Sequence, residues 1–350
     1  MPLLILKGAY MHDIYKNKKV LVTGCRGFCG SWLVLWLQKL GAEVIGYGHF
    51  PPTYPNLHDI LNLSYNLREE LLDHHTVNEF IEQHKPDLVL HLAAHAIVAK
   101  CFEDPRETFE NNIMACTNLL DACRKVGTKG VVFITTDKVY EDENWIWGYR
   151  ENDKLGGLDP YSASKVCMEH IIRCYRESFG MNIAVARAGN VIGGGDWSEK
   201  RLLPDIMKAT AEGKRVIVHT PNATRPWQHT LSALDGYLRL GQKILDGKDV
   251  NSAWNFGPEG EMSVLDVLKV AKKFWDKVDW IIDEKETHKH MVNLLKIDST
   301  KARKELGWNP PWNMYESVAR TVEWYREFYK HGNCISQLDI QGYEEDSYAL

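Results

Sequence analysis

Two residues four positions apart, Tyr161 and Lys165, have the types and spacing needed to remove a proton from a hydroxyl group. They lie in the string PYSASK at the start of a predicted helix, so both side chains share one helix face. A lysine ammonium, with the positive charge of a nicotinamide nearby, lowers the pKa of a phenol from about 10 towards neutrality. The phenolate then takes the hydroxyl proton while hydride leaves the same carbon. The pattern predicts Tyr161 and Lys165 as catalytic residues that also contact a nicotinamide cofactor.

A second group of reactive side chains, Thr136, Asp137 and Lys138, stands at the end of a predicted strand. Ligands bind at the carboxyl ends of the strands in open parallel sheets, so these side chains should line the site. A simple oxidoreductase needs only a hydroxyl here to orient its substrate. The Asp–Lys pair adds an acid and a base, which indicates chemistry beyond hydride transfer. The alternative is a surface salt bridge at a strand end.

Three glycines, Gly24, Gly27 and Gly30, separate the first predicted strand from the first predicted helix. Gly24 permits a tight turn, Gly27 lets the backbone approach a pyrophosphate, and Gly30 lets the helix pack close to the strand. The start of the helix then faces the phosphates. This arrangement predicts a dinucleotide site, and a purely structural turn is the alternative.

The choice of dinucleotide depends on the end of the second predicted strand. A carboxylate there would bind the ribose 2′-hydroxyl of NAD, but the strand ends in Gly48, His49 and Phe50. Arg26, inside the glycine loop, would suit a 2′-phosphate unless it simply faces solvent. NAD is the predicted cofactor, and NADP remains open.

The elements that must position these residues alternate along the chain. Short β-branched runs are followed by helical patterns of ten to twenty residues as far as about residue 193, which predicts βαβ units and an α/β fold with a Rossmann-type doubly wound parallel sheet. A smaller mixed lobe follows, with helices at about 262–276 and 314–330, and the cleft between the lobes is the expected binding site. The last twenty residues are polar and should form a loose tail. The predicted parts are a dinucleotide-binding domain of residues 14–192 and 222–256, a substrate lobe of residues 193–221 and 257–330, and a tail of residues 331–350.

Composition narrows the class of protein. The 350 residues include 42 Lys and Arg against 47 Asp and Glu, a net charge of -5, so a general affinity for nucleic acid is not expected. No apolar stretch is long enough to span a bilayer, and no metal-ligand spacing occurs among the histidines. Cysteines seven apart share a helix face and should be small buried hydrophobes in a reducing compartment, so we expect a cytoplasmic protein. These pairs are Cys116 with Cys123 and Cys167 with Cys174.

The strings TGCRGFCG, HLAAH, TTDK and YSASK together resemble extended short-chain dehydrogenases/reductases that act on nucleotide sugars. The strings RAGNVIGGGDW, RPWQH, AWNFGP and KELGWNPPWN are similar to the CDP-glucose branch of the 4,6-dehydratases, from about Lys18 to Tyr329. The resemblance implies that Tyr161 removes the C4 hydroxyl proton while C4 gives hydride to NAD, with Thr136 holding that oxygen. Lys138, where other branches carry Glu, then takes the C5 proton, and Asp137 protonates the departing C6 hydroxyl. The alternatives are a dehydratase for a GDP- or UDP-linked hexose and an epimerase of the same fold.

The same resemblance implies further contacts and an assembly. Arginine also suits the substrate diphosphate independently, because its planar fork pairs with phosphate oxygens. The helices at 107–126 and 161–179 resemble those that pair between subunits, so a homodimer is predicted. Their apolar residues, Met114, Leu119, Met168 and Ile172, could equally be core against the sheet. Further cofactor contacts are implied for Arg26, Phe28, Glu70, Leu71, Ala93, Ala94 and Asn112, and substrate contacts for Asn190, Arg201 and Arg225.

Overall fold

A sheet of parallel strands forms the centre of the computed structural model, which describes residues 13–51, 53–68, 71–283 and 296–349. Its seven strands lie in the order β11-β6-β5-β4-β1-β2-β3, and each neighbouring pair is parallel. The strands are β1 (Lys19–Thr23), β2 (Glu43–Tyr47), β3 (Asn66–Arg68), β4 (Leu88–His91), β5 (Val131–Ile134), β6 (Ile183–Ala188) and β11 (Ala253–Phe256).

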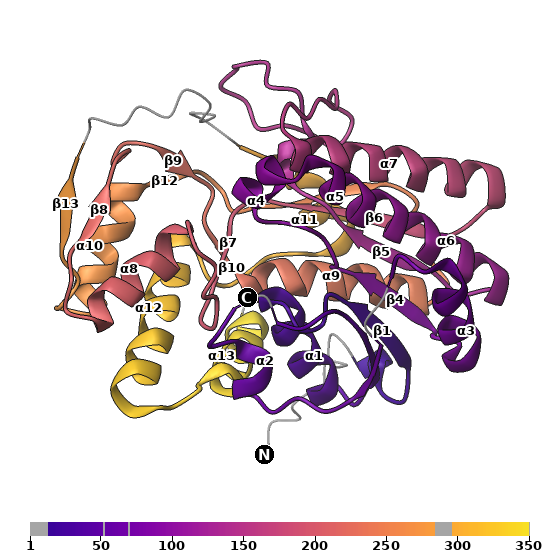
Figure 1. Cartoon of the computed structure of the whole chain (residues 1–350), viewed down its shortest axis with the longest axis horizontal. Helices are drawn as coiled ribbons and strands as arrows, with labels where there is room; N and C mark the ends of the chain where they lie inside the picture. The colour runs from indigo at the N-terminus through magenta and orange to yellow at the C-terminus, as the bar shows by residue number, and fades with distance from the viewer. Residues whose placement is uncertain (1–12, 52, 69–70, 284–295, 350) are drawn as a thin grey trace, which may run out of the picture.

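Both faces of the sheet are buried at its centre, which explains why the central strands β1, β4 and β5 are largely apolar instead of alternating with polar residues. In β1, Val20 and Val22 point into one core and Leu21 into the other. Figure 1 shows α1 and α9 on one side of the sheet and α3, α6 and α7 on the other. The predicted doubly wound fold is therefore confirmed. These helices are α1 (Phe28–Lys39), α3 (His74–His84), α6 (Ala115–Val126), α7 (Pro160–Phe179) and α9 (Thr230–Leu245).

The predicted helix at 107–126 is present without a break but is not α-helical throughout. A π-helical turn, η2 (Glu110–Met114), separates α5 (Pro105–Phe109) from α6. The wider turn holds the fully buried Asn112, whose amide bonds to a neighbouring loop, an interaction that apolar periodicity does not reveal. The helix predicted at 161–179 is present as α7. It starts at the cap of Asp159, whose carboxylate accepts the N–H of Ser162, and ends at Gly180 with a φ of 65°.

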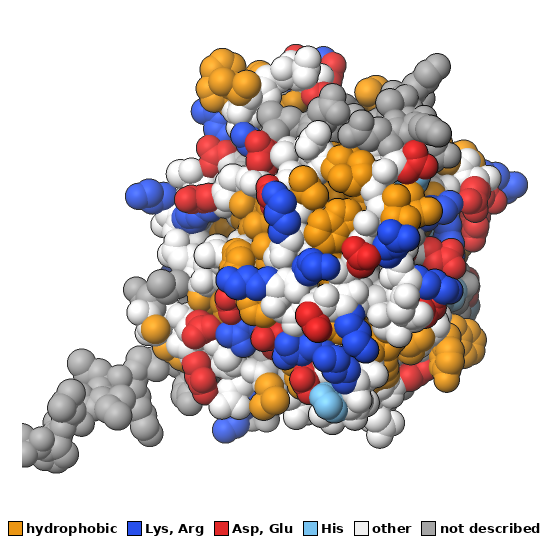
Figure 2. All heavy atoms as spheres, turned by 90° about the vertical axis from the view of Figure 1, so that its left-hand side faces the viewer, with side chains coloured by type: hydrophobic (Ala, Val, Ile, Leu, Met, Phe, Trp, Pro, Cys, Tyr) orange, Lys and Arg blue, Asp and Glu red, His pale blue; other side chains and the backbone are white. Residues whose placement is uncertain are grey.

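The other described residues form three two-stranded sheets and several helices beside the main sheet. The helices predicted at 262–276 and 314–330 are confirmed, whereas the division into domains stays a prediction. On the face that carries β8, β13 and α10, hydrophobic side chains lie among interspersed basic and acidic ones (Figure 2). The paired strands are β7 (Val191–Ile192) with β10 (Gln228–His229), β9 (Thr224–Arg225) with β12 (Met262–Ser263), and β8 (Val216–Val218) with β13 (Trp280–Ile282). The helices are α8 (Leu202–Ala211), α10 (Val264–Phe274) and α12 (Met314–His331), and the short remaining elements are η1 (Asp13–Tyr15), α2 (Leu57–Ile60), α4 (Val98–Glu103), η3 (Asp137–Val139) and α11 (Thr300–Leu306).

The predicted loose tail is wrong, because residues Ser336–Tyr348 form a packed helix, α13. Ile340 and Tyr343 are at most 1% exposed and belong to the main core. The acidic side chains of this segment serve as acceptors for core indoles: Trp36 of α1 donates to Glu344, and Trp312 donates to Asp346, each over 2.8 Å. Two of the acidic residues in this polar segment therefore hydrogen-bond to buried tryptophans, which helps to hold the helix in place.

The two cysteine pairs differ in their surroundings. Cys116 and Cys123 are buried as predicted, but the prediction is wrong for Cys167 and Cys174, which are exposed on the outer side of α7. Of the apolar residues left open between core and interface, Met114 is 47% exposed. The other three, Leu119, Met168 and Ile172, are fully buried in the core against the sheet. Within the described residues, no helix has the length and apolarity needed to cross a membrane.

Candidate functional site

The turn between β1 and α1 requires glycine at two of the three predicted positions. Gly24 has a φ of 68°, and a Cβ there would lie 2.8 Å from the backbone nitrogen of Ala93. A Cβ on Gly30 would lie 2.1 Å from the carbonyl oxygen of Gly24, so α1 packs against the turn only because this residue is glycine. Gly27 is the N-cap of α1 and leaves the first turn without a side-chain cap. This cradle fits a pyrophosphate, because its helix start presents backbone N–H groups without a competing side chain.

The loop after β4 is held against this turn and against α7. The Thr23 hydroxyl lies 2.8 Å from Nδ1 of His91 and accepts the N–H of Ala93 over 3.1 Å. The Asn112 amide accepts the N–H of His95 over 2.8 Å and donates to the Ser164 hydroxyl over 2.8 Å. Asn112 therefore joins the loop that carries Ala93 and the half-buried Ala94 to the helix that carries Lys165.

The remaining residues predicted to contact the cofactor have separate positions. The Arg26 guanidinium lies over the Phe50 ring, 5.4 Å from its centroid, at the end of β2. The Phe28 ring is half-buried, and a Cβ on Gly193 would come within 3.1 Å of it. Leu71 is buried, whereas Glu70 lies outside the described residues. The cofactor roles of these residues stay predictions.

A buried carboxyl stands at the carboxyl end of β5. Asp137 is 2% exposed, and its Oδ1 accepts the Thr136 hydroxyl over 3.1 Å. Burial raises the pKa of Asp137 to about 6, although the positive charge of Lys138, the Thr136 hydrogen bond and the Arg225 guanidinium all lower it. The side chain can therefore hold a proton close to neutral pH, as a general acid must.

Tyr161 and Lys165 both lie on α7, facing the end of β5. Lys165 Nζ donates to the Ile134 carbonyl over 3.0 Å, and burial lowers the pKa of this ammonium to about 8. Burial raises the pKa of Tyr161, while a hydrogen bond with Thr136 lowers it. The chain's own groups therefore do not produce the predicted lowering of the phenol pKa, because desolvation outweighs them.

Two of the three residues predicted to bind substrate exert their charge on the catalytic groups. The Arg225 cation lowers the pKa of Asp137, and the Arg201 cation lowers the pKa of Tyr161. Arg201 is itself paired with Asp196 over 3.1 Å, and it is 38% exposed. Asn190 is half-buried and its carbonyl accepts the N–H of Gln228, which joins β7 to β10. The fold thus brings the two arginines towards the predicted acid and base.

Sequence reasoning missed a buried ion pair beside this site. Glu169 of α7 and Arg187 of β6 are joined through two hydrogen bonds, and their side chains are 6% and 4% exposed. Two signals were available: Glu169 follows Lys165 by one helical turn, and Arg187 interrupts the otherwise apolar strand IAVARA. A charged side chain inside a buried strand needs a partner of opposite charge, so Arg187 indicates a buried acidic residue nearby.

Comparisons with known proteins agree with this fold. Residues 20–256 match the family described as the NAD dependent epimerase/dehydratase family. The CDP-glucose 4,6-dehydratase of Salmonella typhimurium is 39% identical over 350 aligned residues, which cover 95% of this chain and 97% of that protein. The dTDP-glucose 4,6-dehydratase of the same organism is 27% identical, with 94% and 99% covered. The crystal structure of UDP-glucose 4-epimerase from Thermotoga maritima with UDP-glucose has a TM-score of 0.81 at 25% identity, covering 89% of this chain and 100% of that one. The predicted resemblance is confirmed.

Proposed function

The chain belongs to the NAD dependent epimerase/dehydratase family, and we propose that it is a 4,6-dehydratase that converts CDP-D-glucose to its 4-keto-6-deoxy product. Sequence identity of 39% to the Salmonella typhimurium CDP-glucose 4,6-dehydratase, over nearly the whole of both chains, supports the substrate. The observation that carries the reaction type is the buried Asp137 carboxyl, whose pKa is raised to about 6 beside Tyr161. A dehydration needs such an acid to protonate the departing hydroxyl.

The first step is oxidation at C4 of the sugar. Tyr161 removes the proton of the C4 hydroxyl, and the Thr136 hydroxyl holds that oxygen. The buried Lys165 ammonium favours the charged form of the phenol once Tyr161 has lost its own proton. The hydride acceptor for C4, and the later hydride donor for C6, would be bound NAD. The turn of Gly24, Gly27 and Gly30 would hold its pyrophosphate.

Loss of water follows from the acidity of the C5 hydrogen next to the new ketone. Lys138 is half-buried at this strand end. As the neutral amine it takes that proton, and it returns a proton to C5 when C6 is reduced. Asp137 donates its proton to the C6 oxygen, which leaves as water. Arg201 and Arg225 would hold the substrate diphosphate, with Asn190 beside them, because guanidinium forks pair with phosphate oxygens.

Two other reactions fit the same fold. A dehydratase for a GDP- or UDP-linked hexose would use the same residues. An epimerase would keep Tyr161 and Lys165 but has no use for a buried acid at Asp137. The alkaline absorbance of 4-keto-6-deoxy products and the mass of each product separate these cases.

The test is a panel of CDP-, GDP-, UDP- and dTDP-hexoses incubated with purified protein and NAD. We expect CDP-glucose to lose one water and the others to react at least tenfold more slowly. Turnover of another sugar alone would overturn the substrate assignment. A C4-epimerised product of unchanged mass would overturn the dehydratase assignment.

Tyr161→Phe is expected to block the reaction at its first step. Because the phenol is the base that takes the C4 proton, its loss should lower turnover by a factor of 10² to 10⁴. Unchanged nucleotide-sugar binding, measured by calorimetry, would show that the site is intact. Full activity in this variant would assign proton removal to another group.

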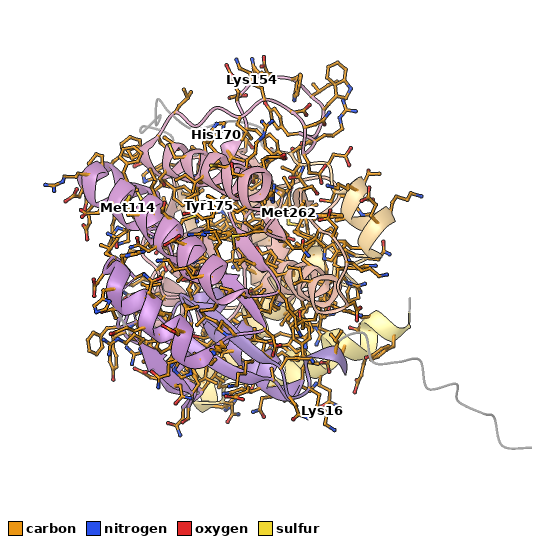
Figure 3. The ribbon with its side chains drawn as sticks, turned by 90° about the vertical axis from the view of Figure 1, so that its right-hand side faces the viewer. Lys16, Met114, Lys154, His170, Tyr175 and Met262 are labelled. Atoms are coloured by element: carbon orange, nitrogen blue, oxygen red, sulfur yellow. The ribbon has the colours of Figure 1, made fainter. Side chains whose placement is uncertain are left out.

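The protein is also proposed to be a cytoplasmic homodimer. Figure 3 shows α6 and α7 side by side on one face, with Met114 and His170 labelled there. Cys167, His170 and Cys174 are all exposed, and their spacing of three and four places them on one side of α7. This stripe and Met114 suit a two-fold contact. The eight free thiols support a reducing compartment.

A further inference from the structure

A chain of buried polar contacts starts at the Glu169–Arg187 ion pair. Arg187 Nε donates to Glu169 Oε1 over 3.0 Å, and Nη2 donates to Oε2 over 2.5 Å, which is a bidentate arrangement. The other guanidinium nitrogen, Nη1, donates to the Tyr140 hydroxyl over 2.8 Å and to the Glu151 carbonyl over 3.0 Å. The pair therefore links α7 and β6 to the loop that follows Lys138.

The same carboxylate reaches the strand that carries the predicted acid and base. Glu169 Oε1 accepts the Thr135 hydroxyl over 2.8 Å, and this contact is fully buried. Thr135 directly precedes Thr136, and Lys165 bonds the carbonyl of Ile134, the residue before Thr135. Two successive residues of the strand end are thus tied to two successive turns of α7.

These two hydrogen bonds connect the two groups of residues that form the site. On one side stand Tyr161 and Lys165 of α7, and on the other stand Thr136 to Lys138 after β5. Because a displacement of about 1 Å in a reacting group costs as much as 10²-fold in rate, the register between the two elements matters. Stability alone is a poor reason for a buried ion pair, since desolvation consumes most of its attraction.

We propose that Glu169, held by Arg187, is a positioning residue that fixes the Thr136–Asp137–Lys138 strand end against Tyr161 and Lys165 through the Thr135 hydroxyl. The proposal rests on the proposed function, because the groups positioned are those of the C4 oxidation and the elimination. Glu169 touches no reacting atom in this scheme and acts through Thr135 and Lys165.

The sharpest test removes a single hydroxyl. Thr135→Val deletes the Thr135–Glu169 hydrogen bond but leaves the carboxylate paired with Arg187, so no buried charge is left without a partner. We expect kcat for 4-keto-6-deoxy product to fall about tenfold with KM within twofold of wild type. Thr135→Ser keeps the hydroxyl and should recover most of that loss. A kcat for Thr135→Val equal to that of wild type would overturn the proposal, as would equal losses in both variants.

A second test removes the charge. Glu169→Gln should move the alkaline limb of the kcat profile to lower pH, because the carboxylate favours the protonated form of Lys165. The other titratable groups beside Lys165 are Cys116 of α6, Cys101 of α4 and His91 of β4. Burial raises the pKa of both thiols and lowers that of His91, which favours the uncharged form of each. Glu169→Asp should restore the limb in part, and Glu82→Gln, on the surface of α3, should leave it unchanged. If the alkaline limb of folded Glu169→Gln lay at the same pH as in wild type, the proposed effect of the Glu169 charge on Lys165 would be overturned.

Different measurements would overturn the proposed dehydration and the positioning role of Glu169. If wild type loses water from no sugar but epimerises one, the proposed dehydration is wrong, and the Thr135 variants are then compared on that C4 oxidation. If Glu169→Gln does not fold, Thr135→Val and Thr135→Ser still test the proposal, since both variants keep the Glu169–Arg187 ion pair. Thermal melting of each variant shows whether a loss of activity comes from lower stability or, in a protein of unchanged stability, from displaced catalytic residues.

Discussion

At the scale of single residues, burial shifts the pKa values of two ionisable groups in the site towards neutral pH, one upwards and the other downwards. It raises the pKa of Asp137 to about 6 and lowers that of Lys165 to about 8. Each group can then change its protonation near neutral pH at little cost, which suits acid–base chemistry. The residue types predicted these roles, but the extent of burial that sets the pKa values depends on the fold.

Replacement of Asp137 by Asn should abolish water loss and stabilise the protein at alkaline pH. The folded pKa of about 6 lies above the ordinary 3.8, so the stability from this group is fully present below pH 3.8 and is lost as pH rises through 6. Asn avoids that loss, which is about 3 kcal/mol at pH 8. Urea unfolding of wild type and Asp137→Asn at pH 8 and pH 3.5 measures this difference in unfolding free energy. Equal stability of both proteins at pH 8 would contradict the assigned direction.

At the scale of elements, the join between β1 and α1 should tolerate no Cβ at Gly30. Gly30→Ala places a methyl group 2.1 Å from the Gly24 carbonyl oxygen, so the helix must move away from the turn. We expect NAD affinity to fall at least tenfold, or about 1.4 kcal/mol, by calorimetry. Gly342→Ala, in α13 with only Arg320 Nη1 at 4.0 Å, is the matched control and should bind NAD as wild type does.

The packing of α13 predicts a large difference between two neighbouring apolar residues. Ile340 is fully buried and Leu338 is 65% exposed on the same helix. Ile340→Ala should cost about 2–5 kcal/mol of unfolding free energy, whereas Leu338→Ala should stay within about 0.5 kcal/mol. Denaturant titration of the two variants checks this. Similar small losses in both would mean that α13 is not docked in solution.

Sequence reasoning succeeded where a local pattern dictates the element. The glycine turn, the strand that ends at Ile134 shortly before Thr136, and the helix starting before Tyr161 carry their own signals, so their positions were predictable. It failed where a partner distant in sequence decides. The Asn112 turn depends on His95, and α13 is ordered by Trp36 and Trp312, none of which is visible in the segment itself. The Glu169–Arg187 pair was missed for the same reason.

At the scale of the whole molecule, a charge on the outer face of α6 and α7 should weaken the proposed dimer. Met114→Glu puts an unpaired carboxylate into an apolar contact, which we expect to raise the dimer dissociation constant at least tenfold. Light scattering after size-exclusion chromatography gives the mass. Ile217→Glu, at an apolar position on β8 that is 57% exposed against 47% for Met114, should leave the mass unchanged. A monomeric wild type would rule out the dimer itself.

The hydrogen bond from Trp36 to Glu344 joins residues 308 positions apart. Proteins are synthesised from the N-terminus at roughly 5–20 residues per second, so α1 leaves the ribosome well before its partner helix exists. Until then the indoles of Trp36 and Trp312 lack the acceptors that α13 supplies. During synthesis, the helix that follows the glycine turn therefore lacks part of its packing until α13 has been made.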